Sequence, residues 1–317
     1  MSGLERQLQD YLVIRRAMGF KMERHAKLLG QFTDHLAAHL AAHHAATQAI
    51  EHALAWAGAP TGADPRWWAA RLSMVRGFAV FLHALDPAHQ VPPRGLMPSS
   101  SRRTVVPYLY TDPEIAALVH AAGELSGPLR AATYQTLIRL LAVTGMRVGE
   151  AIGLDRADLD EDVGLLTMHG TKFGKSRQLP LHPSTTAGLG DYLDLRDRLQ
   201  PVARTSALLV STRGFRLRYT RVWEIFHRLV GQAELTPRSP GCTPRIHDLR
   251  HTFAVTTLLG WYRAGADVRA MLPRLSTYLG HTDPKHTYWY LSAAPELLAL
   301  AADRLEASLD AHQRDLR

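Results

Sequence analysis

The first ninety residues carry three groups of apolar positions at helical spacing. The groups are Leu4, Leu8, Tyr11 and Leu12; Leu28, Phe32, Leu36 and Leu40; and Trp68, Leu72, Val75, Ala79 and Leu82. Residues three or four apart lie on the same face of a helix, so each group predicts an amphipathic helix with one buried side. We therefore expect a small, all-helical domain over residues 1–97.

This pattern stops near residue 100. Residues 91–104 are rich in proline, serine and glycine and have no periodic apolar positions. Such a composition is typical of a segment between domains. The sequence therefore predicts a linker over residues 98–107 and a second domain over residues 108–317.

Helices dominate the pattern of the second domain. Thr111-Asp-Pro-Glu114 has the spacing of a capping box, in which the two outer side chains bond backbone N–H groups at a helix start. A helix from Leu129 to Val143 ends at Thr144-Gly145. Further helices are expected at about 220–231, 247–259 and 267–280, and an amphipathic stretch follows at 295–309.

Short strands are also expected in this domain. Residues 163–168 and 176–181 are β-type segments on either side of a glycine-containing turn, which predicts an antiparallel hairpin, and residues 208–211 are a candidate third strand. The expected fold class is mainly α: an N-terminal helical bundle, then a mostly helical domain with a small antiparallel β-sheet.

Composition narrows the class of protein. Apolar residues make up 46% of the chain and charged residues 21%, which favours globular domains over disorder. No apolar run is long enough for a membrane helix, the N-terminus is charged where a secretion signal would be apolar, and the single cysteine, Cys242, excludes an internal disulfide. We expect a cytoplasmic protein. The net charge of +8 favours a polyanionic partner, with nucleic acid as the first candidate.

Four segments of the second domain carry residues suited to phosphate chemistry. They are Thr144-Gly-Met-Arg147-Val-Gly-Glu150, the turn Gly170-Thr-Lys172-Phe-Gly-Lys175, His247-Asp-Leu-Arg250-His251, and Leu279-Gly-His281 followed by Tyr288 and Tyr290. Arg147 follows a glycine break at the expected start of a helix, where backbone N–H groups favour an anion.

In this order the segments resemble the tyrosine site-specific recombinases, the phage integrase family. The family pattern is an arginine in TGxRxxE, a lysine in a hairpin turn, HxLRH, LGH, and a tyrosine nine residues after the last histidine. Tyr290 is the ninth residue after His281. The helical first domain also resembles the family's core-binding domain, which forms a clamp on DNA with the catalytic domain.

The chemistry of these residues fits that resemblance. Two guanidinium groups, Arg147 and Arg250, can bind the non-bridging oxygens of a phosphodiester and stabilise the added charge of its transition state. His247 can accept a phenolic proton or bond the phosphate, and His281 can hold a phosphate oxygen or position the tyrosine. A lysine on the turn can protonate the departing sugar oxygen. A phosphotyrosine ester keeps the bond energy, so resealing needs neither ATP nor a metal, and no cofactor is expected.

Two assignments have competitors. On a helix Tyr288 and Tyr290 point about 200° apart, so only one can face the phosphate, and the family spacing selects Tyr290. Lys172 and Lys175 share one turn, and counting back from Leu181 aligns Lys172 with the family lysine. The resemblance further implies that Glu150 orients Arg147 and that His251 is a supporting residue.

The resemblance also implies the partners and the course of the reaction. These are double-stranded DNA with inverted-repeat sites, a 3′-phosphotyrosine intermediate, a homo-tetramer on two DNA sites, a Holliday junction, and in some systems accessory proteins. The 295–309 stretch either packs on its own domain or docks on a neighbouring subunit. A type IB topoisomerase and a non-catalytic DNA-binding factor are the alternatives.

Basic and histidine-rich segments supply candidate DNA contacts. The basic residues expected to reach phosphates are Arg102, Arg103, Lys175, Arg213, Arg216, Arg218 and Arg221. His35, His39 and His43 recur every four residues, which suits metal ligands, but no acidic or cysteine cluster lies near them. We therefore expect a solvated or DNA-facing stripe there and no metal site.

Overall fold

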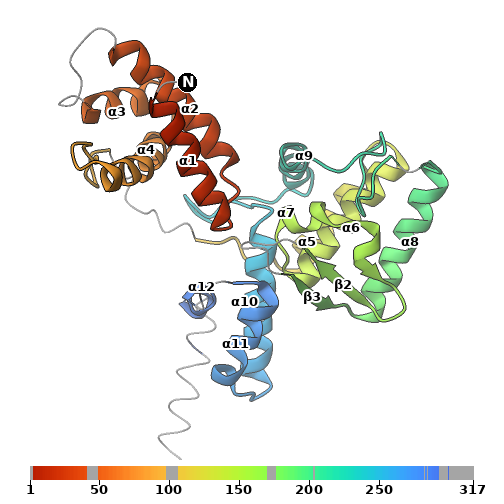
Figure 1. The fold of residues 1–317 in the computed structure, drawn as a ribbon. Helices are drawn as coiled ribbons and strands as arrows, with labels where there is room; N and C mark the ends of the chain where they lie inside the picture. Colours follow the sequence, from red (N-terminus) through yellow and green to blue (C-terminus); the bar gives the residue numbers. More distant parts are fainter. Residues whose placement is uncertain are drawn as a thin grey trace, which may run out of the picture. The chain divides into compact units, whose positions relative to one another are not determined.

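The computed structural model describes residues 3–40, 49–97, 106–169, 176–202, 204–281, 283, 285–292 and 299 (Figure 1). The described residues up to Met97 form one compact unit, and those from Val106 onward form another. The 295–309 stretch, apart from Ala299, lies outside the described residues.

The first unit is built from helices, as the apolar periodicity predicts. They are α1 (Gly3–Ala17), α2 (Glu23–Leu40), α3 (Ala49–Gly58) and α4 (Pro65–Leu85). Asp64 caps α4 by accepting a hydrogen bond from the N–H of Arg66 at 2.8 Å, and Pro65 occupies the first helical turn, where its missing N–H costs nothing. The periodic residues Leu12, Phe32 and Leu72 are buried in a core of their own.

The second unit is also mostly helical. Its helices are α5 (Asp112–Gly123), α6 (Pro128–Thr144), α7 (Val148–Gly153), the 3₁₀ helix η1 (Arg156–Asp158), α8 (Pro183–Leu199), α9 (Tyr219–Gln232), α10 (Asp248–Arg263), α11 (Val268–Leu279), α12 (Lys285–Tyr288) and the 3₁₀ helix η3 (Trp289–Ser292). The capping box at the start of α5 is confirmed, because Thr111 and Glu114 bond each other's backbone N–H groups. Helix α8 is not predicted from the sequence.

A small antiparallel sheet completes this unit. Strands β1 (Leu159–Asp160), β2 (Leu165–Met168) and β3 (Arg177–Pro180) lie in that order, and Met168 pairs with Arg177. The expected hairpin is confirmed, but the third strand is β1 and not residues 208–211. Leu208 to Val210 are buried, and Val210 makes only an isolated bridge to Arg216. Burial on all sides explains why an apolar run imitates a strand at this position.

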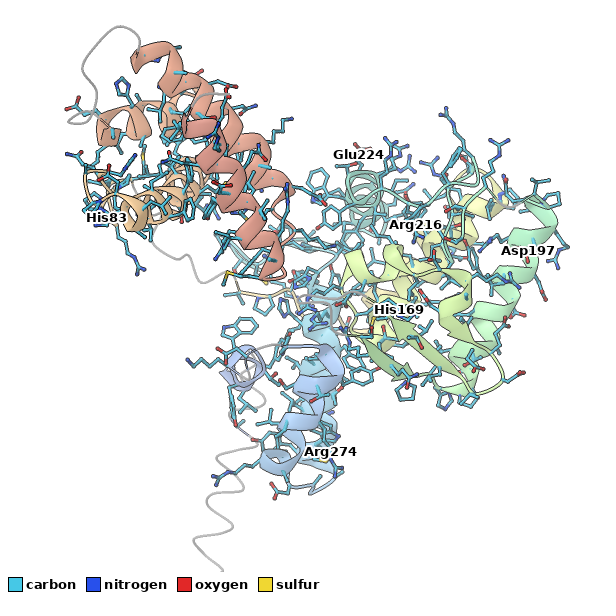
Figure 2. The ribbon with its side chains drawn as sticks, viewed as in Figure 1. His83, His169, Asp197, Arg216, Glu224 and Arg274 are labelled. Carbon is cyan, nitrogen blue, oxygen red and sulfur yellow. The ribbon has the colours of Figure 1, made fainter. Side chains whose placement is uncertain are left out.

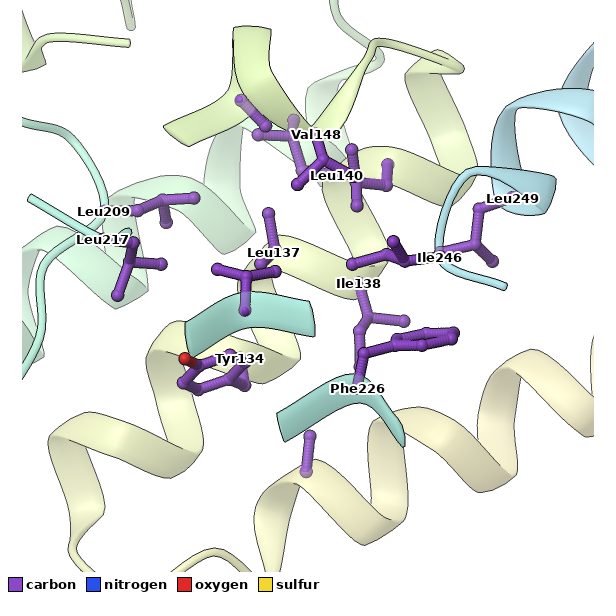
Figure 3. Close-up of a cluster of buried hydrophobic side chains, with 14 of the residues drawn as sticks. Tyr134, Leu137, Ile138, Leu140, Val148, Leu209, Leu217, Phe226, Ile246 and Leu249 are labelled. Atoms are coloured by element: carbon purple, nitrogen blue, oxygen red, sulfur yellow. The ribbon is translucent and has the colours of Figure 1, made fainter. Parts of the chain in front are cut away.

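Helix α6 runs through the core of the second unit (Figure 3). Its side chains Leu137 and Ile138 are fully enclosed, together with Phe226 of α9 and Leu249 at the start of α10. A second apolar cluster joins the rest of α10 to α11 and to Tyr290. Because α10 contributes to both clusters, its first turn is held where they meet.

None of the helices in the described part of the chain combines the length and apolar character that crossing a membrane requires.

Candidate active site

The position of Arg147 depends on the glycine before it. Gly145 ends α6 in the left-handed conformation, with φ of 60°, and a Cβ at this position would lie 2.9 Å from Cγ of Phe253. A glycine is therefore required both by the backbone and by the packing. The chain turns here, and Arg147 becomes the extended residue immediately before α7.

Glu150 holds Arg147 in two ways. The backbone N–H of Arg147 donates to Oε2 at 2.8 Å, and its Nη1 donates to Oε1 at 2.9 Å. Burial alone would raise the pKa of this carboxyl group, yet the hydrogen bonds from Arg177 and Arg147 and their charges lower it below the ordinary value. Nη2 of Arg147 also donates to the carbonyl of Gly280 at 3.3 Å. The arginine that begins α7 is thus fixed by a charged carboxylate and by the main chain.

Arg250 is buried in the first turn of α10. Its Nη1 donates to the carbonyl of Gly145 at 2.8 Å, and its Nη2 donates to the carbonyl of Leu279 at 2.7 Å. Burial, followed by the charge of Arg147, lowers its pKa to about 10, so it remains charged at neutral pH. Arg147 and Arg250 are close enough for the charge of one to act on the other, and such a pair of cations favours an anion at this place.

Two neutral histidines lie beside Arg250. His247 immediately precedes α10, and its ring meets that of His251 edge-on with centroids 5.1 Å apart. The pKa of each falls to about 4, chiefly because burial excludes water and secondly because of neighbouring charges. The residue His247 nevertheless keeps an accessible surface, whereas the His251 side chain is only 17% exposed. An accessible and uncharged imidazole is suited to accept a proton.

Tyr290, and not Tyr288, lies against these groups. Tyr290 is 2% exposed and its ring centroid is 5.5 Å from that of His251, whereas Tyr288 is 51% exposed. The two tyrosines lie in different elements, since Tyr288 ends α12 and Tyr290 lies in the tighter η3. Burial raises the pKa of the Tyr290 phenol, while the hydrogen bond and charge of Arg250 and the charge of Arg147 act in the opposite direction.

His281 completes the group. Gly280 ends α11 in the left-handed conformation, with φ of 68°. The next residue is His281, and its Nδ1 forms a 2.7 Å hydrogen bond with Oγ1 of Thr287. The ring of His281 stacks beside that of Tyr290 with centroids 6.0 Å apart. The structure therefore brings together four segments of the chain, which carry Arg147, Glu150, His247, Arg250, His251, His281 and Tyr290.

Arg177 joins this group although the sequence analysis did not select it. Its Nη1 and Nη2 donate to Oε1 and Oε2 of Glu150 at 3.1 and 2.9 Å. The available signal is the strand period, since Arg177 and the buried Leu179 lie on one face of β3. A cation on the buried face of a strand needs a carboxylate partner, because an unpaired buried charge is costly.

Lys172 and Lys175 lie outside the described residues, as do Arg102 and Arg103. The strands that flank the lysine turn are described, and they pair up to Met168 and Arg177.

The remaining predicted DNA contacts divide into two kinds. Arg213, Arg218 and Arg221 are exposed, and Arg221 pairs with Glu224 at 2.7 Å. Arg216, labelled in Figure 2, differs from these residues. It donates to the carbonyls of Ile152 and Leu154 and to the carboxylate of Asp155. These bonds assign Arg216 to holding the chain after α7.

The histidine stripe gives no metal site among the described residues. His35 and His39 stack with ring centroids 4.1 Å apart, and His52 of α3 lies 5.4 Å from His39. His43 lies outside the described residues, and no group of three potential ligands in the described part of the chain is placed to hold a metal ion.

Comparisons with known proteins agree with this geometry. The model of the phage integrase family matches residues 109–296. A Sinorhizobium fredii protein named as the integrase/recombinase y4rB is 43% identical over 312 residues, covering 96% of this chain and 98% of that protein. The tyrosine recombinase XerD of Mycobacterium tuberculosis is 34% identical over 233 residues, covering 70% of this chain and 68% of that protein.

Solved structures share the fold. The Tn1549 transposon integrase in complex with transposon right end DNA has a TM-score of 0.64 at 16% identity, over 95% of this chain and 98% of that one. The XerH site-specific recombinase bound to palindromic difH DNA has a TM-score of 0.58 at 18% identity, over 82% of this chain and 72% of that one. Similarity at this level of identity concerns the fold alone.

Proposed function

The chain belongs to the phage integrase family and is a tyrosine recombinase that cleaves and rejoins DNA strands, and from this premise we propose that Tyr290 is the residue that becomes joined to DNA. The observation that carries the proposal is one buried phenol that lies beside the histidines His251 and His281, shares a hydrogen bond with Arg250 and feels the charge of Arg147 in the same chain. Membership of this family does not favour the topoisomerase alternative. A protein that only binds DNA would not need the full set of catalytic side chains that the sequence carries, so the second alternative is not favoured either.

The first chemical step breaks one strand. Oη of Tyr290 attacks the scissile phosphorus, the bond from phosphorus to the 5′ oxygen breaks, and a 3′-phosphotyrosine ester forms. Arg147 and Arg250 hold the non-bridging oxygens through the five-coordinate transition state. His247 accepts the phenolic proton, and Lys172 gives a proton to the departing 5′ oxygen. The second step is the reverse attack by a 5′-hydroxyl, so the strands reseal without any external energy.

Ionising the phenol is a central cost of this step. A tyrosine with a pKa near 10 needs about 4 kcal/mol to lose its proton at pH 7, and burial of Tyr290 raises its pKa further. A phenol held this way is inert in the free chain. Removal of its proton by His247 during the attack avoids a separate ionisation, and the arginines stabilise the charge as it moves onto the phosphate.

The finer course of the reaction is inferred from related proteins. In our proposal the first unit and the second unit form a clamp on the duplex, and four protomers act on two inverted-repeat sites through a Holliday junction. The XerH structure with palindromic difH DNA supports such a paired site. The Tn1549 integrase and the Sinorhizobium integrase/recombinase support a role in a mobile element.

A cleavable duplex is the first requirement of a test. The chain is incubated with a library of duplex fragments, and the DNA that stays attached after denaturation in detergent is sequenced. This trapped duplex is then used with Tyr290→Phe and with the matched control Tyr288→Phe. We expect Tyr290→Phe to bind the duplex normally and form no adduct, whereas Tyr288→Phe forms adducts as the unmodified chain does. Adducts that persist in Tyr290→Phe would refute the assignment.

The lysine is tested with a modified leaving group. A duplex whose bridging 5′ oxygen is replaced by sulfur needs no proton on departure. We expect this duplex to restore cleavage by Lys172→Ala, while Lys175→Ala cleaves the ordinary duplex at a normal rate. Restoration of Lys175→Ala alone would transfer the role of general acid to Lys175.

A further inference from the structure

Glu150 is shared between two arginines, and this sharing is the starting point of the inference. Oε1 accepts from Nη1 of Arg147 and Nη1 of Arg177, and Oε2 accepts from the backbone N–H of Arg147 and Nη2 of Arg177. Each carboxylate oxygen therefore bonds both residues. Among the described residues, Glu150 accepts every side-chain hydrogen bond that Arg177 donates.

Arg177 also lies directly against Gly280. A Cβ on Gly280 would lie 2.8 Å from Cζ of Arg177, so only a glycine lets the guanidinium lie this close. The carbonyl of that same Gly280 accepts from Nη2 of Arg147. Arg177, Glu150, Arg147 and Gly280 thus form a closed ring of contacts.

From this ring of contacts we propose that Arg177 is a positioning residue for the recombination reaction. It acts through Glu150 and holds Arg147 in its phosphate-binding geometry. The inference rests on the proposed function of Arg147. Without Arg177 the carboxylate would keep only the two bonds from Arg147, so a rotation about its terminal bond would need to break those two alone and would release the N–H of Arg147. The bidentate pair with Arg177 prevents this rotation, and the pair is shielded, since its side chains are 12% and 13% exposed.

A charge-only role makes a different prediction. If Arg177 acted only as a nearby cation, lysine would replace it, because lysine keeps the charge. Lysine cannot make the two parallel hydrogen bonds of a guanidinium. We expect both Arg177→Gln and Arg177→Lys to lower the single-turnover cleavage rate, by about 100-fold and at least 10-fold respectively, as small misplacements of a catalytic group do. Recovery of the Arg177→Lys rate to within about 3-fold of the unmodified chain would overturn the positioning role.

A second readout separates positioning from general damage to the fold. The trapped duplex is prepared with a neutral methylphosphonate at the scissile position, which removes the charge that Arg147 neutralises. If Arg177 acts through Arg147, the loss in Arg177→Gln shrinks to within about 10-fold on this duplex, and Arg147→Ala shows the same relief. An equal loss of cleavage rate on the ordinary and the methylphosphonate duplex would overturn the inference. The inference would also be overturned if the 5′-sulfur duplex, and not the methylphosphonate duplex, restored the rate of Arg177→Gln.

The controls keep the two proposals distinguishable. Arg156→Gln removes another arginine–carboxylate pair, the exposed 2.7 Å pair with Asp197, and should leave the rates on every duplex unchanged. Tyr290→Phe is run in the same assay. Adducts in Tyr290→Phe would refute the proposed function, whatever Arg177 does. Absence of adducts in Tyr290→Phe together with normal cleavage by both Arg177 variants would refute only the present inference.

Discussion

Single side chains of the site show what a sequence can and cannot predict. Motif spacing was enough to select Arg147, His247, Arg250, His281 and Tyr290, and the structure brings all five together. It could not select Arg177, because the reason for that residue is a carboxylate 27 positions away in the chain. It also could not show that the tyrosine is buried or that the histidines are neutral, since both depend on packing between segments.

The neutral histidines have a consequence for stability. His251 has a pKa of about 4 in the folded chain against an ordinary value of 6.5. Between these values the unfolded chain binds a proton that the folded chain does not, so stability is complete above pH 6.5 and falls as the pH drops towards 4. We expect the free energy of unfolding of the second unit to fall by about 2 kcal/mol from this residue between pH 7 and pH 5.

Urea denaturation at the two pH values measures this effect. In His251→Gln the difference between pH 7 and pH 5 should become smaller, whatever the variant's absolute stability. His120→Gln is the matched control, because His120 is 82% exposed and should leave the difference unchanged. An unaltered difference in His251→Gln would show that its ring titrates normally in the folded chain.

At the level of elements, periodicity and capping signals found most helices, but they missed α3 and misjudged three other features. Helix α8 contains Gly188 and Gly190, which weaken its helical signal, although Leu189, Tyr192, Leu193 and Arg196 are buried at helical spacing. Strand β1 is only two residues long and has no period to detect. Residues 208–211 imitate a strand because Leu208, Leu209 and Val210 are all buried. Each error arises where tertiary packing outweighs local preference.

The segment between α7 and α9 gives an element-scale prediction. Arg216 has three acceptors at the end of α7 and just after it, whereas Arg218 is exposed at the start of α9. We expect Arg216→Ala to lower the free energy of unfolding by about 1–3 kcal/mol, because it removes the charged donor of two carbonyls and a carboxylate. Leu154 and Asp155 keep second donors, the N–H of Leu208 and the hydroxyl of Ser206, whereas the bond to Ile152 is lost outright. Arg218→Ala should leave stability unchanged and reduce the slope of log binding constant against log salt by about 0.9, the value for one lost phosphate contact. Urea titrations and DNA binding at several salt concentrations measure the two effects. The reverse pattern would assign Arg216 to DNA and Arg218 to the fold.

On the scale of the whole molecule, each unit has its own apolar core. Phe78 is 1% exposed in the core of the first unit, and Leu137 is fully buried in that of the second. Units with separate cores unfold separately unless their interface is large. The helical periodicity predicted both units, but it carries no information about how strongly they are coupled.

Calorimetry tests this independence. We expect two unfolding transitions, and Phe78→Ala should destabilise one of them by about 3–5 kcal/mol while leaving the other in place. Leu137→Ala should shift the other transition, by about 2–5 kcal/mol. A single transition that moves as a whole in both variants would show that the units unfold together.

The bonds that fix Arg250 have an evolutionary consequence. Its guanidinium is held by the main-chain oxygens of Gly145 and Leu279, and Arg147 uses that of Gly280 in the same way. Every amino acid supplies such an oxygen, so these anchors survive most substitutions in the surrounding sequence, although Gly145 and Gly280 must themselves remain glycine. A reactive centre whose arginines are hydrogen-bonded to the peptide backbone can keep its shape while the side chains around it diverge. Distant descendants of one ancestor can then differ at most positions and still cut DNA in the same way.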